Sequence, residues 1–140
     1  RGLLLALAVW LGSVRWAAVL EPERPDVAVT GPGAPPLVTT ESTPAKVALA
    51  EHLTANGAVM YSAYWCPHCH DQKQAFGKEA AKKLTVIECA ADGQNSQRSL
   101  CESKKIEGFP TWEINGKLDS GVKPLDVLAR LSGFKGGSDF

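Results

Sequence analysis

The segment AYWCPHCHDQ, residues 63–72, constrains the fold of this chain more than any other stretch. Its CPHC run is a CxxC pair, the spacing used for dithiol–disulfide chemistry, and His70 extends it to CxxCH, the spacing that attaches c-type haem. The short apolar run AVMYSAY precedes the pair and is typical of a buried strand. Pro67 suits the first turn of a helix that would follow. The surrounding chain has to decide between the two chemistries.

Residues 45–135 alternate between helical and strand-like patterns. AKVALAEHLTANG predicts a helix that stops near Gly57, and PHCHDQKQAFGKEAAKKL predicts a single helix over residues 67–84. SQRSLCESKKI predicts a short helix, and KPLDVLARLSGF predicts an amphipathic one that carries Leu125, Leu128 and Leu131. AVMYSAY and TVIECA predict buried strands, while TWEING and KLDSG predict a hairpin with an Asn-Gly turn. The expected fold class is α/β, with residues 136–140 as a tail.

The region before this domain has a different composition. Residues 2–20 are apolar or small apart from Arg15, and as a helix they would span about 28 Å, close to the thickness of the bilayer core. We expect a transmembrane helix over residues 1–20, with a signal peptide or a buried helix as the alternatives. Residues 21–44 are rich in proline and predict a semi-rigid linker. Because the chain begins with Arg1, we expect a fragment or a processed product.

The charge balance argues against nucleic acid as a partner. The chain has 15 basic and 15 acidic residues, and no basic run stands out. Binding to phosphates needs concentrated lysine and arginine, so nucleic-acid binding is not expected.

A CxxC pair directly after a buried strand and at the start of a helix is the thioredoxin arrangement. Cys66 would lie just before the first turn, where unpaired N–H groups and the helix dipole favour a thiolate, the form that attacks disulfides. Cys69, one turn further on, would be shielded and would resolve a mixed disulfide by attacking Cys66. We therefore expect Cys66 to be the nucleophile and Cys69 to be the resolving thiol.

Trp65, Pro67 and the GFPT run at residues 108–111 together resemble the thioredoxin-fold oxidoreductases. The resemblance implies that Pro110 is cis, lies against the active-site cysteines and, with Phe109, receives the substrate chain. It also implies that His68, between the cysteines, favours an oxidising pair. Met60 falls where reducing thioredoxins usually carry a buried acidic residue, which points in the same direction.

Haem and zinc fit the sequence poorly. The only methionine, Met60, lies inside a predicted strand, and nothing requires His52 as an axial ligand, so we expect His70 to be a solvent-facing residue of the helix. No second CxxC or HxxxH completes a tetrahedral zinc set, and we expect no metal site. For Cys89 and Cys101, a structural disulfide is favoured over two reduced cysteines or an electron relay.

The whole arrangement resembles cyanobacterial and plant vitamin K epoxide reductase homologues, in which a multi-helix membrane domain is joined to a thioredoxin-like domain. AYWCPHCHDQKQAFGKEA looks like the active-site segment of that domain, and Cys89 and Cys101 look like its additional cysteine pair. The resemblance implies a domain that oxidises protein thiols and passes the electrons to a quinone-reducing membrane domain, with no cofactor of its own. It implies a location on the oxidising side of a membrane, in the periplasm or the thylakoid lumen. A disulfide reductase or isomerase and a haem- or metal-binding module are the alternative functions.

Overall fold

The structure, a computed structural model, describes residues 30–140. The expected transmembrane helix at residues 1–20 and the first part of the expected linker lie outside the described residues. Within residues 30–140, no helix is both long and apolar enough to cross a bilayer.

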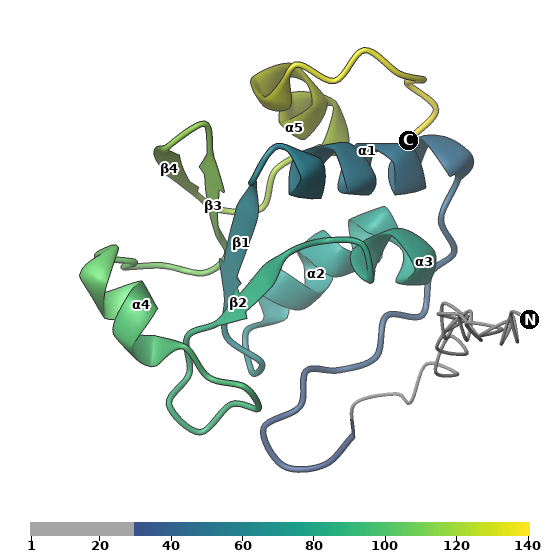
Figure 1. Cartoon of the computed structure of the whole chain (residues 1–140). Coiled ribbons are helices and arrows are strands. Elements are labelled where there is room, and N and C mark those ends of the chain that lie inside the picture. The colour runs from purple at the N-terminus through teal and green to yellow at the C-terminus, as the bar shows by residue number, and fades with distance from the viewer. Residues whose placement is uncertain (1–29) are drawn as a thin grey trace, which may run out of the picture.

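The described chain folds into a four-stranded sheet with helices on both faces (Figure 1). In chain order the elements are α1 (Pro44–Ala55), β1 (Val59–Ser62), α2 (Pro67–Phe76), α3 (Lys78–Ala81), β2 (Val86–Glu88), α4 (Arg98–Ser103), β3 (Thr111–Ile114), β4 (Lys117–Ser120) and α5 (Leu125–Ser132). The Asn115-Gly116 turn joins β3 to β4, as the sequence predicts, and both turn residues have positive φ angles.

The strand order in the sheet is β2-β1-β3-β4. Strand β1 pairs in parallel with β2 and antiparallel with β3, so that Met60 lies between Val86 and Trp112. Strand β4 is an exposed edge, paired antiparallel with β3. The sheet thus begins with a parallel pair, β1 and β2, joined through the helix that follows the CxxC motif. An antiparallel hairpin and a final helix come next, and this is the thioredoxin-like arrangement expected from the sequence.

Two apolar clusters hold the sheet between its helices. On one face, Met60 and Trp112 pack with buried residues of α1, α2, α3 and α5, among them Leu53, Phe76 and Leu128. On the other face, a smaller cluster lies under α4 and contains Tyr61, Ile87 and the two cysteines Cys89 and Cys101. Neighbouring residues of β1 therefore serve opposite faces, as the two-residue period of a strand requires.

The single helix predicted over residues 67–84 is wrong, because the chain breaks at Gly77 into α2 and α3. Gly77 has a φ of +89°, and a Cβ atom there would lie 2.6 Å from the carbonyl oxygen of Glu41 and 2.5 Å from the Oγ of Ser42. The break lets residues 41 and 42 cross the helix ends at close range. Residues 41 and 42 are more than thirty positions away from Gly77 in the sequence. The local helical pattern around Gly77 therefore could not predict this contact.

Residues 30–43, here called the strap, have no helix or strand but lie along α2 and α3 (Figure 1). At one end the backbone N–H groups of Thr39 and Thr40 donate to Oε1 of Gln74, at 2.9 and 3.2 Å. At the other end the N–H of Gln94 donates to the carbonyl oxygen of Gly33 at 3.0 Å. The strap is therefore fastened to the domain at both ends by hydrogen bonds.

The C-terminal helix and tail differ in detail from the expected pattern. Leu125 and Leu128 of α5 are buried, but Leu131 is exposed, so the apolar face of this helix is narrower than predicted. The tail packs back on the domain, with the ring of Phe140 6.4 Å from that of Phe134.

Candidate active site

Cys66 lies at the junction between β1 and α2. It is the N-cap residue of α2 in an extended conformation, its N–H donates to the carbonyl oxygen of Ala63 at 2.9 Å, and Pro67 occupies the first helical position. Its side chain is only 7% exposed and makes no cap hydrogen bond. As the N-cap residue, Cys66 precedes the first turn of α2, whose N–H groups have no partner within the helix and stabilise negative charge. Both Cys66 and Cys69 are free thiols.

Cys69 is one turn further along the helix and is more deeply buried, at 2% exposure. Burial raises the pKa of its thiol to about 11, and a hydrogen bond with the Cys66 side chain acts in the same direction. Hydrogen bonds from the Ser62 hydroxyl and the Ala63 backbone oppose the shift without cancelling it. Cys69 is therefore held as a thiol, while Cys66 is the cysteine nearer to the surface.

The loop that precedes β3 closes the site from the other side. The Phe109–Pro110 peptide bond is cis, and Pro110 is fully buried. The Cys66 thiol donates to the carbonyl oxygen of Phe109 at 3.7 Å, so the loop backbone lies directly against the first cysteine. The ring of Phe109 also meets the ring of Trp65 edge to face, with centroids 6.1 Å apart. The structure thus brings Trp65, Cys66 and the Phe109–Pro110 loop together.

The remaining residues of the CxxC segment divide between surface and interior. Pro67 and His68 are exposed, and Trp65 is 60% exposed, so together they form the outer rim of the site. His70 is half-buried and its Nδ1 atom is buried without a hydrogen-bond partner, which contradicts the expectation of a solvent-facing histidine. The histidine lines a small pocket together with Cys66 and Cys69.

Two further charged residues, Lys73 and Glu88, belong to the surroundings of the site and were not identified from the sequence. Lys73 of α2 lines the same pocket, and it interacts electrostatically with Cys69 and with Glu88 at the end of β2. The four-residue spacing of Cys69 and Lys73 on a predicted helix would have placed them on one face. Nothing local to Glu88 indicates its position, since only the pairing of β2 with β1 brings it to the site.

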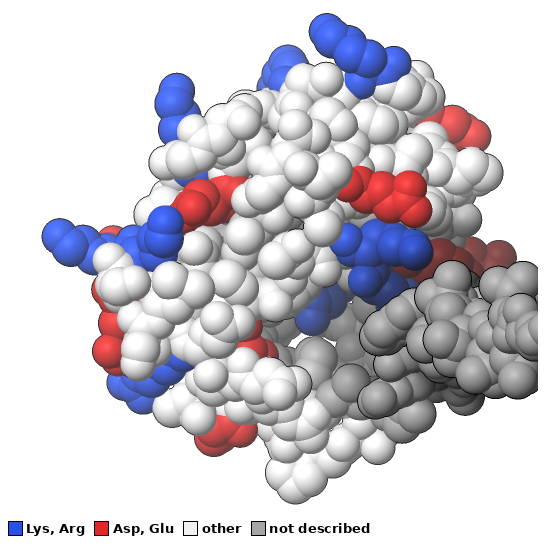
Figure 2. Space-filling model, viewed as in Figure 1, with Lys and Arg blue, Asp and Glu red and all other residues white. Residues whose placement is uncertain are grey.

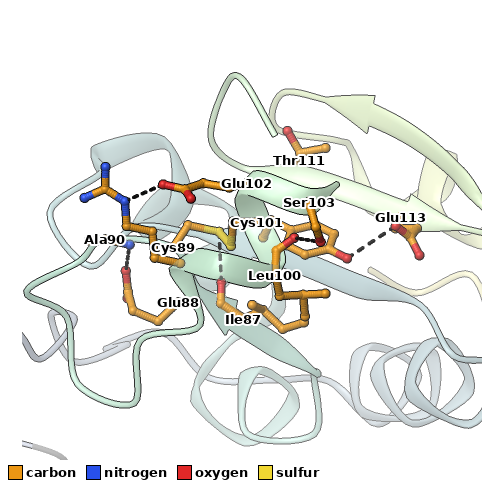
Figure 3. The surroundings of a disulfide bond; sticks show 12 residues. Ile87, Glu88, Cys89, Ala90, Leu100, Cys101, Glu102, Ser103, Thr111 and Glu113 are labelled. Atoms are coloured by element: carbon orange, nitrogen blue, oxygen red, sulfur yellow. Dashed lines mark hydrogen bonds and ion pairs between the residues drawn. A yellow bond between two sulfur atoms is a disulfide. The ribbon is translucent and has the colours of Figure 1, made fainter. Parts of the chain in front are cut away.

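Cys89 and Cys101 form a disulfide that joins the end of β2 to α4, with Cα atoms 5.7 Å apart (Figure 3). Both residues are buried in the cluster beneath α4. The Sγ atom of Cys89 lies 3.8 Å from the carbonyl oxygen of Ile87. The bond therefore closes the loop between β2 and α4 on the face of the sheet opposite Met60, whereas Cys66 and Cys69 belong to the cluster on the Met60 face.

No metal site is found in the part of the chain that the structure describes. Among residues 30–140, no three histidine, cysteine or acidic side chains are grouped so that they could hold a metal ion. On the face seen in Figure 2, lysines, arginines and acidic residues are interspersed rather than gathered into one patch.

Comparison with known proteins finds relatives for this region. No known family model matches the chain. Over 100 residues the chain is 47% identical to the protein named thiol-disulfide oxidoreductase LTO1 of Arabidopsis thaliana, a match that covers 69% of this chain. The matched region spans 27% of the length of that relative, about a quarter.

A solved structure, oxidised glutaredoxin 2 from Chlamydomonas reinhardtii, is 27% identical and overlaps with 64% of this chain and 94% of its own. Its TM-score of 0.38 is too low to establish a shared fold. We therefore base the assignment on the sheet topology, the cis-proline loop and the Arabidopsis relative. The described part of the chain is a thioredoxin-like domain, with a CxxC dithiol at the start of α2.

Proposed function

We propose that this domain is a thiol–disulfide oxidoreductase that acts on protein thiols through Cys66 and Cys69. The observation that carries the proposal is the asymmetry of the pair: Cys66, at 7% exposure, is the less buried cysteine and lies against the Phe109–Pro110 loop, while Cys69, at 2% exposure, has a raised pKa. A nucleophile needs access, and its partner needs to be shielded from other thiols. The name of the Arabidopsis relative supports the same reaction class.

In the proposed reaction the Cys66–Cys69 disulfide accepts two electrons from a substrate dithiol. A substrate thiolate attacks Sγ of Cys66, the bond between the two sulfurs breaks, and Cys69 leaves as a thiolate that takes up a proton. A second substrate thiolate then attacks the substrate sulfur of the mixed disulfide, and Cys66 leaves. The substrate gains a disulfide, and both cysteines of the domain are left reduced.

The direction of exchange is proposed to be oxidising. Pro67 and His68 between the cysteines resemble the dipeptide of oxidising disulfide donors, and Met60 occupies a fully buried position without an acidic group. The disulfide between Cys89 and Cys101 is compatible with an oxidising compartment, such as the periplasm or the thylakoid lumen. We place the domain there, on that side of a membrane.

Continued turnover needs an acceptor for the electrons. By the resemblance to vitamin K epoxide reductase homologues, we propose that Cys66 and Cys69 are reoxidised by a quinone-reducing membrane domain, to which residues 2–20 would connect this domain. No cofactor is proposed for the thioredoxin-like domain itself, since thiol exchange requires only its two sulfurs.

A glutathione redox titration of the full chain, followed by thiol alkylation and intact mass, tests the function and its direction. We expect a Cys66–Cys69 midpoint well above the value of about −270 mV that is typical of thioredoxin. A thioredoxin-like midpoint would favour a reductase. Cys66→Ser should abolish exchange, and Cys69→Ser should accumulate a mixed disulfide at Cys66 with a disulfide-bonded substrate. Full turnover in either variant would overturn the assigned roles.

A further inference from the structure

A narrow pocket lies beside the two cysteines. It is lined by Pro35, Pro36, Ser62, Ala63, Tyr64, Cys66, Cys69, His70 and Lys73. The strap contributes the two prolines, and the space that they cover is too narrow to admit a water molecule. A proton that reaches Cys69 through this pocket therefore has to come from a side chain that lines it.

Lys73 is placed to supply that proton. It follows Cys69 by four residues on α2, the spacing that puts two side chains on the same face one turn apart. Its side chain is half-buried, and its ammonium group interacts electrostatically with the Cys69 sulfur and with the Glu88 carboxylate. Burial lowers the pKa of Lys73 below its ordinary value, while the neighbouring negative charges partly offset the shift.

Glu88 is held rigidly at this position. Its Oε1 atom accepts hydrogen bonds from the backbone N–H of Tyr64 at 3.2 Å and of Ala90 at 2.9 Å. Gly93 packs against the stem of the side chain, so closely that a Cβ atom there would lie 2.5 Å from Cγ of Glu88. The carboxylate is therefore a fixed negative charge that interacts electrostatically with the Lys73 ammonium group.

We propose, on the basis of the function proposed above, that Lys73 is the proton donor to Cys69 when Cys69 leaves the Cys66–Cys69 disulfide. The substrate thiolate forms a bond to Sγ of Cys66, the electron pair of the broken sulfur–sulfur bond goes to Cys69, and the Lys73 ammonium gives one proton to that thiolate. Lys73 is left as a neutral amine and recovers its proton from solvent. Glu88 is a positioning residue for the ammonium group.

The direction of this transfer agrees with the acidities of the two groups. The Cys69 thiol has a pKa of about 11, and burial holds that of the Lys73 ammonium below its ordinary 10.5, so the proton is more stable on sulfur. The titratable groups that line this space beside Lys73 are Tyr64, Cys66, Cys69 and His70, while the strap presents only the two prolines. The hydroxyl of Tyr64 is already engaged, since it donates to Asp92 at 2.8 Å, and Glu88 of β2 interacts electrostatically with Lys73.

His70 is the competing donor, because its buried Nδ1 has no partner and it lines the same pocket. Lys73 is favoured because it follows Cys69 by one turn on the same face of α2, whereas His70 is the next residue along the helix and does not share that face. Lys73 is also the group that interacts electrostatically with both the Cys69 sulfur and the Glu88 carboxylate.

The test is a stopped-flow measurement of mixed-disulfide formation between the oxidised full chain and glutathione, as a function of pH. Lys73→Met keeps the length and apolar stem of the side chain, and Lys83→Met, at an exposed lysine, is the matched loss of charge. We expect Lys73→Met to react about 100-fold more slowly than wild type at pH 7, at the low end of general acid catalysis. Lys83→Met should react at the wild-type rate.

Two variants separate proton donation from charge and from the histidine. Lys73→Arg keeps the charge but gives up a proton poorly, so it should remain slow. Three results would each overturn the proposal. The first is a wild-type rate in Lys73→Arg, and the second is a Lys73→Met rate equal to that of Lys83→Met. The third is a loss of rate in His70→Gln while Lys73→Met keeps the wild-type rate. If wild type itself forms no mixed disulfide at Cys66, the proposed function fails first. If wild type reacts at Cys66 but Lys73→Met reacts equally fast, the proposed function is supported and the proton-donor role of Lys73 is wrong.

Discussion

Gln72 and Trp112 are joined inside the core: the indole N–H of Trp112 donates to Oε1 of Gln72 at 3.1 Å. Gln72 is fully buried on α2, and its Oε1 also accepts from the backbone N–H of Lys123 at 2.7 Å, while its amide donates to the Lys123 carbonyl oxygen at 3.0 Å. One polar side chain therefore links the active-site helix, strand β3 and the loop before α5.

Replacing this glutamine should be costly. Gln72→Ala leaves the N–H groups of Trp112 and Lys123 without a partner in the core, and it opens a cavity as well. We expect the free energy of unfolding to fall by about 3 kcal/mol, from the unsatisfied donors and the lost packing. Denaturant unfolding measures this value. Gln97→Ala, at an exposed glutamine whose side chain caps nothing, is the control and should change stability little.

Gly77 tests the crossing of the strap over the helix break. Gly57 has a positive φ of +76° and open space around its Cβ position, so Gly57→Ala is the variant without a clash and should cost about 1 kcal/mol. Gly77 combines its φ of +89° with a ψ of 164°, a backbone conformation that is essentially restricted to glycine. Gly77→Ala adds a clash with Glu41 and Ser42, which should cost about 1–3 kcal/mol more. Equal losses of unfolding free energy in the two variants would show that the strap moves aside without cost.

The Cys89–Cys101 disulfide should stabilise the fold without taking part in exchange. Its sequence separation is 12 residues, and the double variant Cys89→Ala/Cys101→Ala is expected to lose about 3 kcal/mol of unfolding free energy. Because this pair lies on the opposite face of the sheet from Cys66, we expect mixed-disulfide formation at Cys66 to persist below the unfolding temperature. Loss of exchange in a variant that remains folded would instead favour an electron relay between the two pairs.

The raised pKa of Cys69 predicts how the stability of the reduced protein depends on pH. The thiol has a pKa of about 11 in the folded protein and an ordinary value of 9.0, so the unfolded chain gives up this proton first. The contribution of Cys69 to the stability of the reduced protein is therefore complete below pH 9 and is lost as the pH rises toward about 11. Alkylation of Cys69 in a Cys66→Ser variant, followed against pH, measures the folded pKa with burial, the largest cause of the shift, still in place. A midpoint near 9 would contradict the burial argument.

Much of the site was predictable because its signals are local. The CxxC pair, the proline at the first helical position and the apolar strand before it are contiguous, and each depends on neighbours within a turn or two. The Asn115-Gly116 turn is likewise specified by the two residues that must adopt positive φ. The elements and their order followed from these patterns, apart from the break at Gly77.

The remaining features depend on contacts between distant segments. Gly77 ends a helix because Glu41 and Ser42 cross there, and Gln72 is buried because Trp112 and Lys123 supply its partners. Such positions look like ordinary polar or helical residues until the chain is folded, since burial and pairing are properties of the packed state.

The sequence alone therefore determined which cysteines form the CxxC pair and which elements surround them, because spacing along the chain encodes turns, helix starts and strand periods. Only the tertiary structure decided the environment of the buried thiol: the strap that covers it, the cis-proline loop against Cys66, and the placing of Lys73 and Glu88 near Cys69. The physical reason is that solvent exclusion and electrostatic interaction depend on distances in space, and these are fixed only when the sheet, the helices and the strap pack together.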